Sequence, residues 1–199
     1  MKTINILVAG VGGQGTLLAS DILTEVGMRA GYDTKKSDVL GLAVRGGSVL
    51  SHVRWGERIA SPVVSAGGMD FLVAFEPLEA MRGVGYLHSR SVVVCNTQPL
   101  PPVSVSSGED SYPSPETIES ALADASGGVH LVDATSEALR VGSTKVTNIV
   151  LLGAFSTLLP VDRETWEDVI LGRVPERFIE LNQAAFAAGR VLLKGGAES

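Results

Sequence analysis

A glycine-rich segment near the N-terminus is the part of the sequence whose residue types most clearly suggest chemistry. It reads Gly10-Val11-Gly12-Gly13-Gln14-Gly15 and fits the pattern G-x-G-x-x-G. Glycines allow backbone N–H groups to approach an oxygen atom closely, and a helix that begins directly after them adds partial positive charge. The segment therefore predicts a site for a phosphate or a carboxylate, with the candidate binding residues Gly10, Gly12, Gly13, Gln14 and Gly15. The alternative is that these glycines only form a tight turn between a strand and a closely packed helix.

A second candidate is Arg45, which is followed by Gly46, Gly47 and Ser48. A guanidinium group presents a rigid fork of donors that can bind a carboxylate or a phosphate bidentately. Two glycines after it would let the backbone bend, so that the side chain points toward a ligand or a subunit junction. We therefore add these four residues to the candidate binding site. The alternative is a solvated arginine on a surface loop.

Other kinds of site are poorly represented. The sequence has no nucleoside-triphosphate loop of the type G-x-x-x-x-G-K-[S/T], and its histidines, at positions 52, 88 and 130, are too far apart in the chain to suggest a metal site. Cys95 ends an apolar run, where a free cysteine is more often a buried side chain than a reactive one. We therefore expect no catalytic residue and no metal site in this chain.

A nicotinamide-dependent reductase is a further alternative for the glycine-rich segment. That fingerprint needs an acidic residue about 20 positions on, at the end of the second strand. Asp33 and Asp38 bracket the position, but neither falls cleanly at the end of an apolar run. Tyr32 and Lys36 have the Tyr-x-x-x-Lys spacing of short-chain dehydrogenases, yet they lie near a predicted strand rather than on a late helix. We interpret that spacing as a coincidence.

The elements that must position these residues alternate between strands and helices. Short apolar or β-branched runs predict strands at residues 4–9, 32–37, 48–55, 71–75, 91–95 and 129–133. Helical spacing predicts helices at residues 16–29, 77–82, 116–124, 145–159, 163–170 and 175–193. Residues 96–115 hold five of the nine prolines and predict a loop. The pattern indicates an α/β fold: a single Rossmann-like domain over residues 1–199, with a mostly parallel twisted sheet and C-terminal helices packed on it.

Composition sets the outer limits of function. The 199 residues are 45% hydrophobic and carry a formal net charge of −6, which suits one large core and offers no overall positive field for nucleic acid. The longest strongly apolar stretch, residues 149–159, is shorter than the ~18 residues that a membrane span needs. One cysteine excludes an internal disulfide and an iron–sulfur cluster held by this chain alone. We expect a cytoplasmic protein without membrane or nucleic-acid partners.

Two segments taken together resemble a known family. Residues 8–16 (VAGVGGQGT) and 37–54 (SDVLGLAVRGGSVLSHVR) are similar to the gamma domain of the 2-oxoacid:ferredoxin oxidoreductases, most of all to the small subunits of the indolepyruvate type. The resemblance continues through residues 61–62, 70–76 (DFLVAFE), 147–154 (TNIVLLGA) and 180–189 (ELNQAAFAAG), so it covers nearly the whole chain. The second segment departs from the usual E-V-H-G-M-A-Q-R-G-G-S-V at four positions, namely Asp38, Leu40, Leu42 and Val44.

The resemblance implies a division of labour between subunits. It implies that a large catalytic partner carries thiamine diphosphate, magnesium and iron–sulfur clusters, decarboxylates an indolepyruvate or other aryl 2-oxoacid, and passes electrons to ferredoxin. This chain would be the subunit without thiamine and without clusters, with coenzyme A as a candidate ligand. The four departures leave the identity of the 2-oxoacid open. The alternative is a stand-alone module that binds a nucleotide or coenzyme A and has no redox chemistry.

Overall fold

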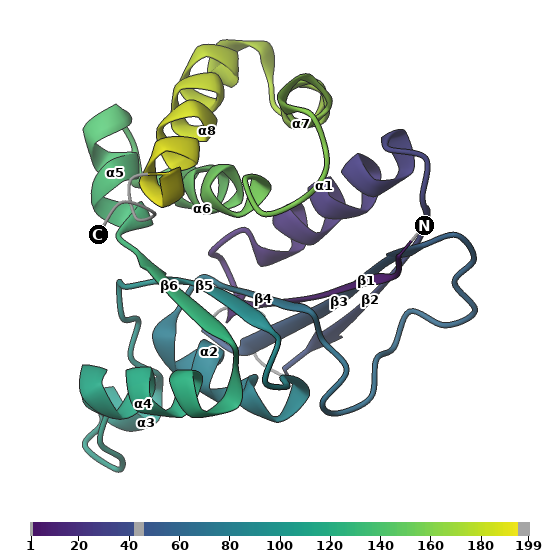
Figure 1. The fold of residues 1–199 in the computed structure, drawn as a ribbon. Coiled ribbons are helices and arrows are strands. Elements are labelled where there is room, and N and C mark those ends of the chain that lie inside the picture. The colour runs from purple at the N-terminus through teal and green to yellow at the C-terminus, as the bar shows by residue number, and fades with distance from the viewer. Residues whose placement is uncertain (1, 42–45, 195–199) are drawn as a thin grey trace.

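A six-stranded sheet forms the middle layer of the protein. The computed structural model describes residues 2–41 and 46–194. The strands run in the spatial order β2-β3-β1-β4-β5-β6. Their bounds are β1 Ile4–Val11, β2 Asp33–Leu40, β3 Ser48–Gly56, β4 Phe71–Ala74, β5 Val92–Asn96 and β6 Gly128–Val132. Helices cover both faces of this sheet, which gives a single α/β domain of three layers (Figure 1).

All strands except β3 run in the same direction. β1, β4, β5 and β6 pair in parallel, whereas β3 is antiparallel to both of its neighbours, β1 and β2. β2 and β3 are consecutive in the chain, and such a short connection can only join antiparallel strands. The prediction of a mostly parallel sheet is confirmed. The order nevertheless differs from that of the usual dinucleotide-binding fold, because β3 separates β2 from β1.

One face of the sheet carries what we call the upper layer, which lies above the sheet in Figure 1. It consists of α1 Thr16–Arg29, α5 Ala134–Val141, α6 Thr147–Ser156, α7 Arg163–Gly172 and α8 Ile179–Lys194, with short 3₁₀ turns at Thr144–Val146 and Glu176–Phe178. α6 is the centre of this layer, and every residue from 148 to 156 is buried. α6 and α8 meet through glycines, because a Cβ on Gly189 would come within 1.9 Å of the Val150 carbonyl oxygen.

The opposite face carries the lower layer. It consists of α2 Pro77–Arg82, α3 Val103–Ser106 and α4 Pro115–Ala125, with a 3₁₀ turn at Val84–Tyr86 (Figure 1). The Pro-rich loop, residues 97–114, joins β5 to α4 and contains the short helix α3. The apolar core of the lower layer is smaller than that of the upper layer. The lower layer also buries two carboxylates, Glu76 and Glu79.

The predicted elements match the structure closely in type and less closely in extent. The predicted bounds of α1 and α2 are those observed. β2 runs on to Leu40 instead of ending at residue 37, because it stays paired with β3 up to Val49. The C-terminal helices pack on the sheet as expected, although the predicted helix at 145–159 is a 3₁₀ turn followed by the shorter α6. Among the described residues, no helix is long and apolar enough to cross a membrane.

Candidate functional site

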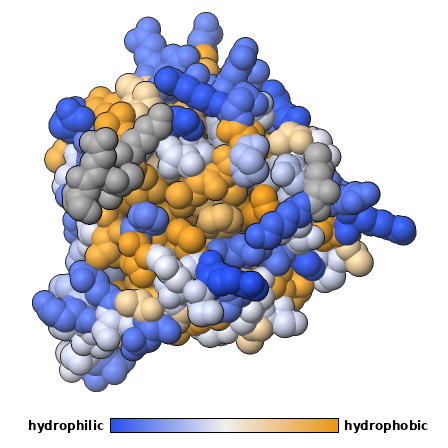
Figure 2. Space-filling view, in the orientation of Figure 1, coloured by the Kyte–Doolittle hydropathy of each residue, from blue (hydrophilic) through white to orange (hydrophobic). Residues whose placement is uncertain are grey.

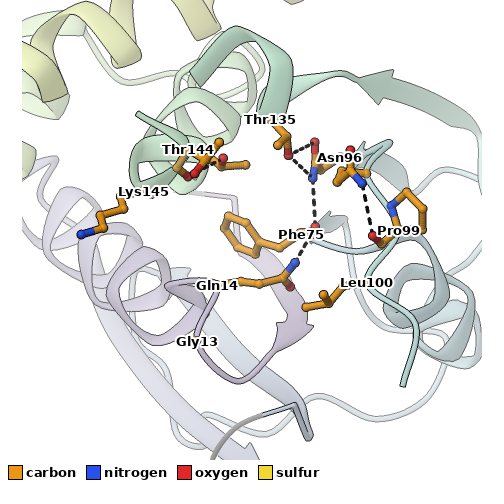
Figure 3. A pocket seen from close by; sticks show the side chains of 11 residues that line it. Gly13, Gln14, Phe75, Asn96, Pro99, Leu100, Thr135, Thr144 and Lys145 are labelled. Carbon is orange, nitrogen blue, oxygen red and sulfur yellow. Dashed lines mark hydrogen bonds between the residues drawn. The ribbon is translucent and has the colours of Figure 1, made fainter. Parts of the chain in front are cut away.

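The carboxyl ends of the parallel strands meet at one edge of the sheet, and a cavity lies there. The chain leaves β1 toward the upper layer through α1 and leaves β4 toward the lower layer through α2, so the space between these strand ends is the point where ligands bind in open α/β sheets. The cavity has a volume of about 450 Å³ (Figure 3). It is lined by Gly13, Gln14, Phe75, Asn96, Gln98, Pro99, Leu100, Thr135, Thr144, Lys145 and Thr147.

The glycine turn, residues 10–15, connects β1 to α1 beside this cavity. Gly13 and Gly15 have φ angles of 106° and 82°, a region that other residues rarely adopt. Close packing also requires a glycine at position 15, because a Cβ there would lie 2.6 Å from the side-chain amide nitrogen of Asn148 on α6. A Cβ on Gly10 would meet the Thr16 hydroxyl at 2.6 Å. The turn is therefore a packing device as well as a candidate binding site.

Gln14 has a positioning role within the turn. Its side-chain oxygen accepts a hydrogen bond from the Val11 N–H at 2.8 Å, and its side-chain nitrogen donates to the Phe75 carbonyl oxygen at 3.2 Å. The side chain thus folds back and joins the end of β1 to the end of β4 (Figure 3). Its polar atoms are occupied by the protein itself.

The backbone N–H groups of the turn divide into two sets. Those of Gly12 and Gln14 already donate within the chain, to the carbonyl oxygens of Gly47 at 2.8 Å and of Val11 at 3.1 Å. Those of Gly13 and Gly15 have no acceptor among the residues that the structure describes. The first N–H groups of α1 are unpaired within the helix, as at every helix start. The donors that remain for an anion are therefore Gly13, Gly15 and the first turn of α1.

The second predicted motif packs against the first. Gly46 donates its N–H to the Gly12 carbonyl oxygen at 3.3 Å, so residues 46–47 support the turn from behind. Ser48 opens β3, and its hydroxyl donates to Glu79 in the lower layer rather than facing the cavity. Arg45, together with Leu42 and Val44, lies outside the described residues, so its predicted role stays a prediction.

The remaining departures from the family pattern lie on β2. Leu40 is exposed, and it lines a second cavity of about 360 Å³ on the other side of the glycine turn. Asp38 pairs with Lys36 at 2.9 Å and accepts a hydrogen bond from the Ser51 hydroxyl at 2.6 Å. Thr16 also lines this second cavity of about 360 Å³, and its buried hydroxyl has no hydrogen-bond partner in the described part of the chain.

Sequence reasoning missed Asn96, which holds three elements together at the cavity. Its amide nitrogen donates to the Phe75 carbonyl oxygen at 3.2 Å and to the Thr135 hydroxyl at 3.1 Å, and its oxygen accepts from the Ala134 N–H at 3.1 Å (Figure 3). The side chain is buried at the end of β5. Its position directly after an apolar strand was the one signal in the sequence.

Sequence reasoning also missed Lys145, the cationic side chain of the cavity. It lies in the turn before α6, and its exposed ammonium group makes no ion pair among the described residues. Thr147, the first residue of α6, lines the same cavity. The start of α6 and the glycine turn that precedes α1 therefore meet at this cavity, together with a lysine that has no ion pair in the described part of the chain, and this arrangement favours an anionic ligand.

Residues considered for other chemistry have structural roles. Tyr32 packs on Trp55 with ring centroids 5.6 Å apart, and Lys36 pairs with Asp21 and Asp38. Cys95 is buried, and burial raises the pKa of its thiol to about 12, so the thiol is protonated at neutral pH. The described residues contain no group of three His, Cys, Asp or Glu side chains that could hold a metal ion.

Comparison with known proteins gives consistent matches over the full length. The family described as pyruvate ferredoxin/flavodoxin oxidoreductase matches residues 5–192. The chain is 38% identical over 192 residues to indolepyruvate oxidoreductase subunit IorB of Thermococcus kodakarensis, and this match covers 95% of each chain.

Solved structures give the same result for the fold. The gamma subunit of a keto/oxoacid ferredoxin oxidoreductase from Geobacter sulfurreducens superposes with a TM-score of 0.71 at 26% identity, covering 96% of this chain and 99% of that one. The 2-oxoglutarate:ferredoxin oxidoreductase of Magnetococcus marinus, solved with 2-oxoglutarate, coenzyme A and succinyl-CoA, gives a TM-score of 0.76 at 20% identity. That match covers all of this chain and 32% of the longer one, and at this identity it concerns the fold alone.

Proposed function

Because the chain belongs to the pyruvate ferredoxin/flavodoxin oxidoreductase family, we propose that it is the small subunit of an oxidoreductase that acts on indolepyruvate or another aryl 2-oxoacid. The observation that carries this proposal is the 38% identity to an indolepyruvate oxidoreductase subunit over 95% of both chains. The match runs along the whole of both chains, and the relative is itself a subunit of an oxidoreductase. This disfavours the alternative of a stand-alone nucleotide-binding module.

The partner in this proposal is a large catalytic subunit. We assign the iron–sulfur clusters to it, because the single cysteine of this chain is buried and a cluster needs about four thiolates. We also assign thiamine diphosphate and magnesium to it, as the family resemblance implies. Electrons then leave the complex to ferredoxin. Apolar residues gather near the centre of the face drawn in Figure 2, within a rim of polar residues. An exposed apolar area of this kind is typical of a surface that contacts another protein.

Within the complex, we assign to the 450 Å³ cavity the binding of coenzyme A. Coenzyme A accepts the acyl group through its thiol, while its phosphates are the anionic groups that a protein can grip. The N–H group of Gly13, which has no acceptor among the described residues, the start of α6 and the ammonium group of Lys145 are the donors of this cavity suited to a phosphate. The residues present therefore fit the ligand that the family resemblance implies.

The test is a kinetic comparison in the reconstituted complex. Co-expression with the large subunit should give a complex that purifies together and oxidises an aryl 2-oxoacid in the presence of coenzyme A. Lys145→Ala should raise the KM for coenzyme A about tenfold, equivalent to about 1.4 kcal/mol, because one charge-assisted contact is lost. Lys35→Ala, which removes a half-buried lysine on β2 that lies 3.9 Å from Asp33 and does not line the cavity, is the control.

Gly13→Ala tests the turn itself. A methyl group at Gly13 meets no described atom within 4 Å, but the positive φ angle forces the backbone away from the geometry that exposes the N–H group. Gly67 is the control, because it also has a positive φ angle, of 69°, but it lies on the loop before β4 and does not line the cavity. A rise in the KM for coenzyme A in Gly13→Ala but not in Gly67→Ala supports the site. If neither Lys145→Ala nor Gly13→Ala changes this KM, coenzyme A binds elsewhere.

A further inference from the structure

The Pro-rich loop forms one wall of the cavity. Gln98, Pro99 and Leu100 line it, across from the Lys145 side (Figure 3). Apart from the four residues of α3, the loop has no regular structure that could fix its position. Its place over the strand ends must therefore be set by specific contacts with the rest of the protein.

Glu76 supplies those contacts from beneath the loop. It lies two residues after the end of β4, at the start of α2, and has no exposed surface. One of its carboxylate oxygens accepts hydrogen bonds from the Leu100 N–H, at 3.0 Å, and from the Tyr112 hydroxyl. The other oxygen accepts from the Glu79 N–H at 2.9 Å and caps the start of α2. A single carboxylate thus holds the loop near both of its ends.

The charge of Glu76 matters because three donors converge on it. A buried carboxylate is costly unless its oxygens are hydrogen-bonded, and here both are. Burial, and then Glu76 itself, raise the pKa of the Tyr112 phenol, which keeps that group protonated and able to donate. An amide in place of the carboxylate would offer one acceptor and one NH₂ group, so at least one of the existing donors would face another donor.

We propose that Glu76 is a positioning residue whose buried carboxylate holds the Pro-rich loop where Leu100 forms the cavity wall, and so sets the affinity for coenzyme A without touching it. This rests on the proposed binding of coenzyme A in that cavity. Glu76 does not line the cavity, and its contacts with the loop are made to Leu100 and Tyr112. Its effect on the ligand therefore passes through the loop.

Three variants separate this role from a general loss of stability. Glu76→Gln keeps the size of the side chain and removes the charge. Tyr112→Phe leaves the carboxylate intact and removes one of its donors, so it remains informative if Glu76→Gln does not assemble. Glu79→Gln is the matched control, because Glu79 is also a buried carboxylate and lies in the first turn of α2, but its partners are Ser48 and Arg82 rather than the loop.

Two measurements on the assembled complex give the result. Hydrogen exchange of the peptides covering residues 97–114 should accelerate about tenfold in Glu76→Gln and less in Tyr112→Phe. The KM for coenzyme A should rise about fivefold in Glu76→Gln, with kcat at saturating coenzyme A within a factor of two of the wild type. Glu79→Gln should leave both the loop exchange and this KM unchanged.

The outcomes that overturn the proposal are distinct from failure of the coenzyme A site. Unchanged exchange of the loop in both Glu76→Gln and Tyr112→Phe means that Glu76 does not hold it. Faster exchange with an unchanged KM, while Lys145→Ala still raises that KM, means that the loop position does not affect the ligand. If Lys145→Ala has no effect either, the proposed site of coenzyme A is wrong, and the inference falls with it.

Discussion

The two layers that enclose the cavity are held in place by different forces. In the upper layer, α6 is buried from residue 148 to residue 156 and meets α8 through glycines that permit close backbone contact. In the lower layer, the Pro-rich loop and α2 are held by hydrogen bonds to the buried carboxylates Glu76 and Glu79. The cavity therefore lies between a wall fixed by shape and a wall fixed by buried charge.

This difference predicts which substitutions each layer tolerates. Close packing is sensitive to added volume, because there is no space into which the neighbouring backbone can move. A polar network is sensitive to lost partners, because a donor or acceptor left unpaired in the interior costs about 1–3 kcal/mol. Large effects in the upper layer should follow from adding atoms, and those in the lower layer from removing hydrogen bonds.

The largest effect is expected from Gly189→Ala. Its methyl group would lie 1.9 Å from the Val150 carbonyl oxygen, so α8 must move away from α6. We expect a loss of about 3 kcal/mol in the free energy of unfolding, measured by urea denaturation, even though alanine favours the helical state. Gly172→Ala at the end of α7 is the control, since its Cβ would meet no described atom within 4 Å. Equal stability of the two variants would contradict packing by shape.

A smaller effect is expected from Asn96→Ala at the edge of the sheet. This substitution leaves the Ala134 N–H without its acceptor and removes one of the two side-chain donors to the Phe75 carbonyl oxygen. We expect a loss of about 2 kcal/mol by urea denaturation. Thr135→Val removes only the hydroxyl that accepts from Asn96, so it should cost less than half as much. An equal or larger cost in Thr135→Val would show that Asn96 does not organise this edge.

The difference between close packing and the hydrogen bonds of single residues also explains which features the sequence could predict. The bounds of α1 were predictable because its apolar residues recur at helical spacing and a glycine turn precedes it. The glycine turn itself was found because its spacing is a recognisable pattern. β2 was predicted too short, because its last residues are polar or exposed and only the pairing with β3 keeps them extended.

The polar residues that line the cavity or hold its wall could not be found in this way. Asn96, Lys145 and Glu76 are single residues at the ends of elements, and a single residue has no periodicity. They come together only because parallel strands share one edge and because the chain returns over that edge before α6. The role of Ser48 as a ligand-binding residue stays a prediction, although its hydroxyl donates a hydrogen bond to Glu79. That bond depends on the register of β3 beside β1, which the sequence does not specify.

The smallest effect concerns pH and should be confined to the lower face of the sheet. His52 lies there against Tyr86, with ring centroids 5.3 Å apart, and its Nδ1 accepts a hydrogen bond from the Val64 N–H at 3.2 Å. Burial lowers the pKa of this imidazole from its ordinary value of 6.5. The unfolded chain therefore takes up a proton at a higher pH than the folded protein does, so stability falls as the pH drops through 6.5 and toward the lowered pKa.

For one proton, this loss cannot exceed about 1.4 kcal/mol per pH unit. Urea denaturation of the wild type and of His52→Gln between pH 7.5 and pH 5.5 measures it. The wild type should lose about 1 kcal/mol more than the variant over this range, because glutamine can still accept from Val64 but does not titrate. Parallel stability curves for the two proteins would contradict the prediction. In that case, the hydrogen bonds on the lower face of the sheet would keep the same strength in this range of pH. Protonation of His52 would then not lower the stability of the protein.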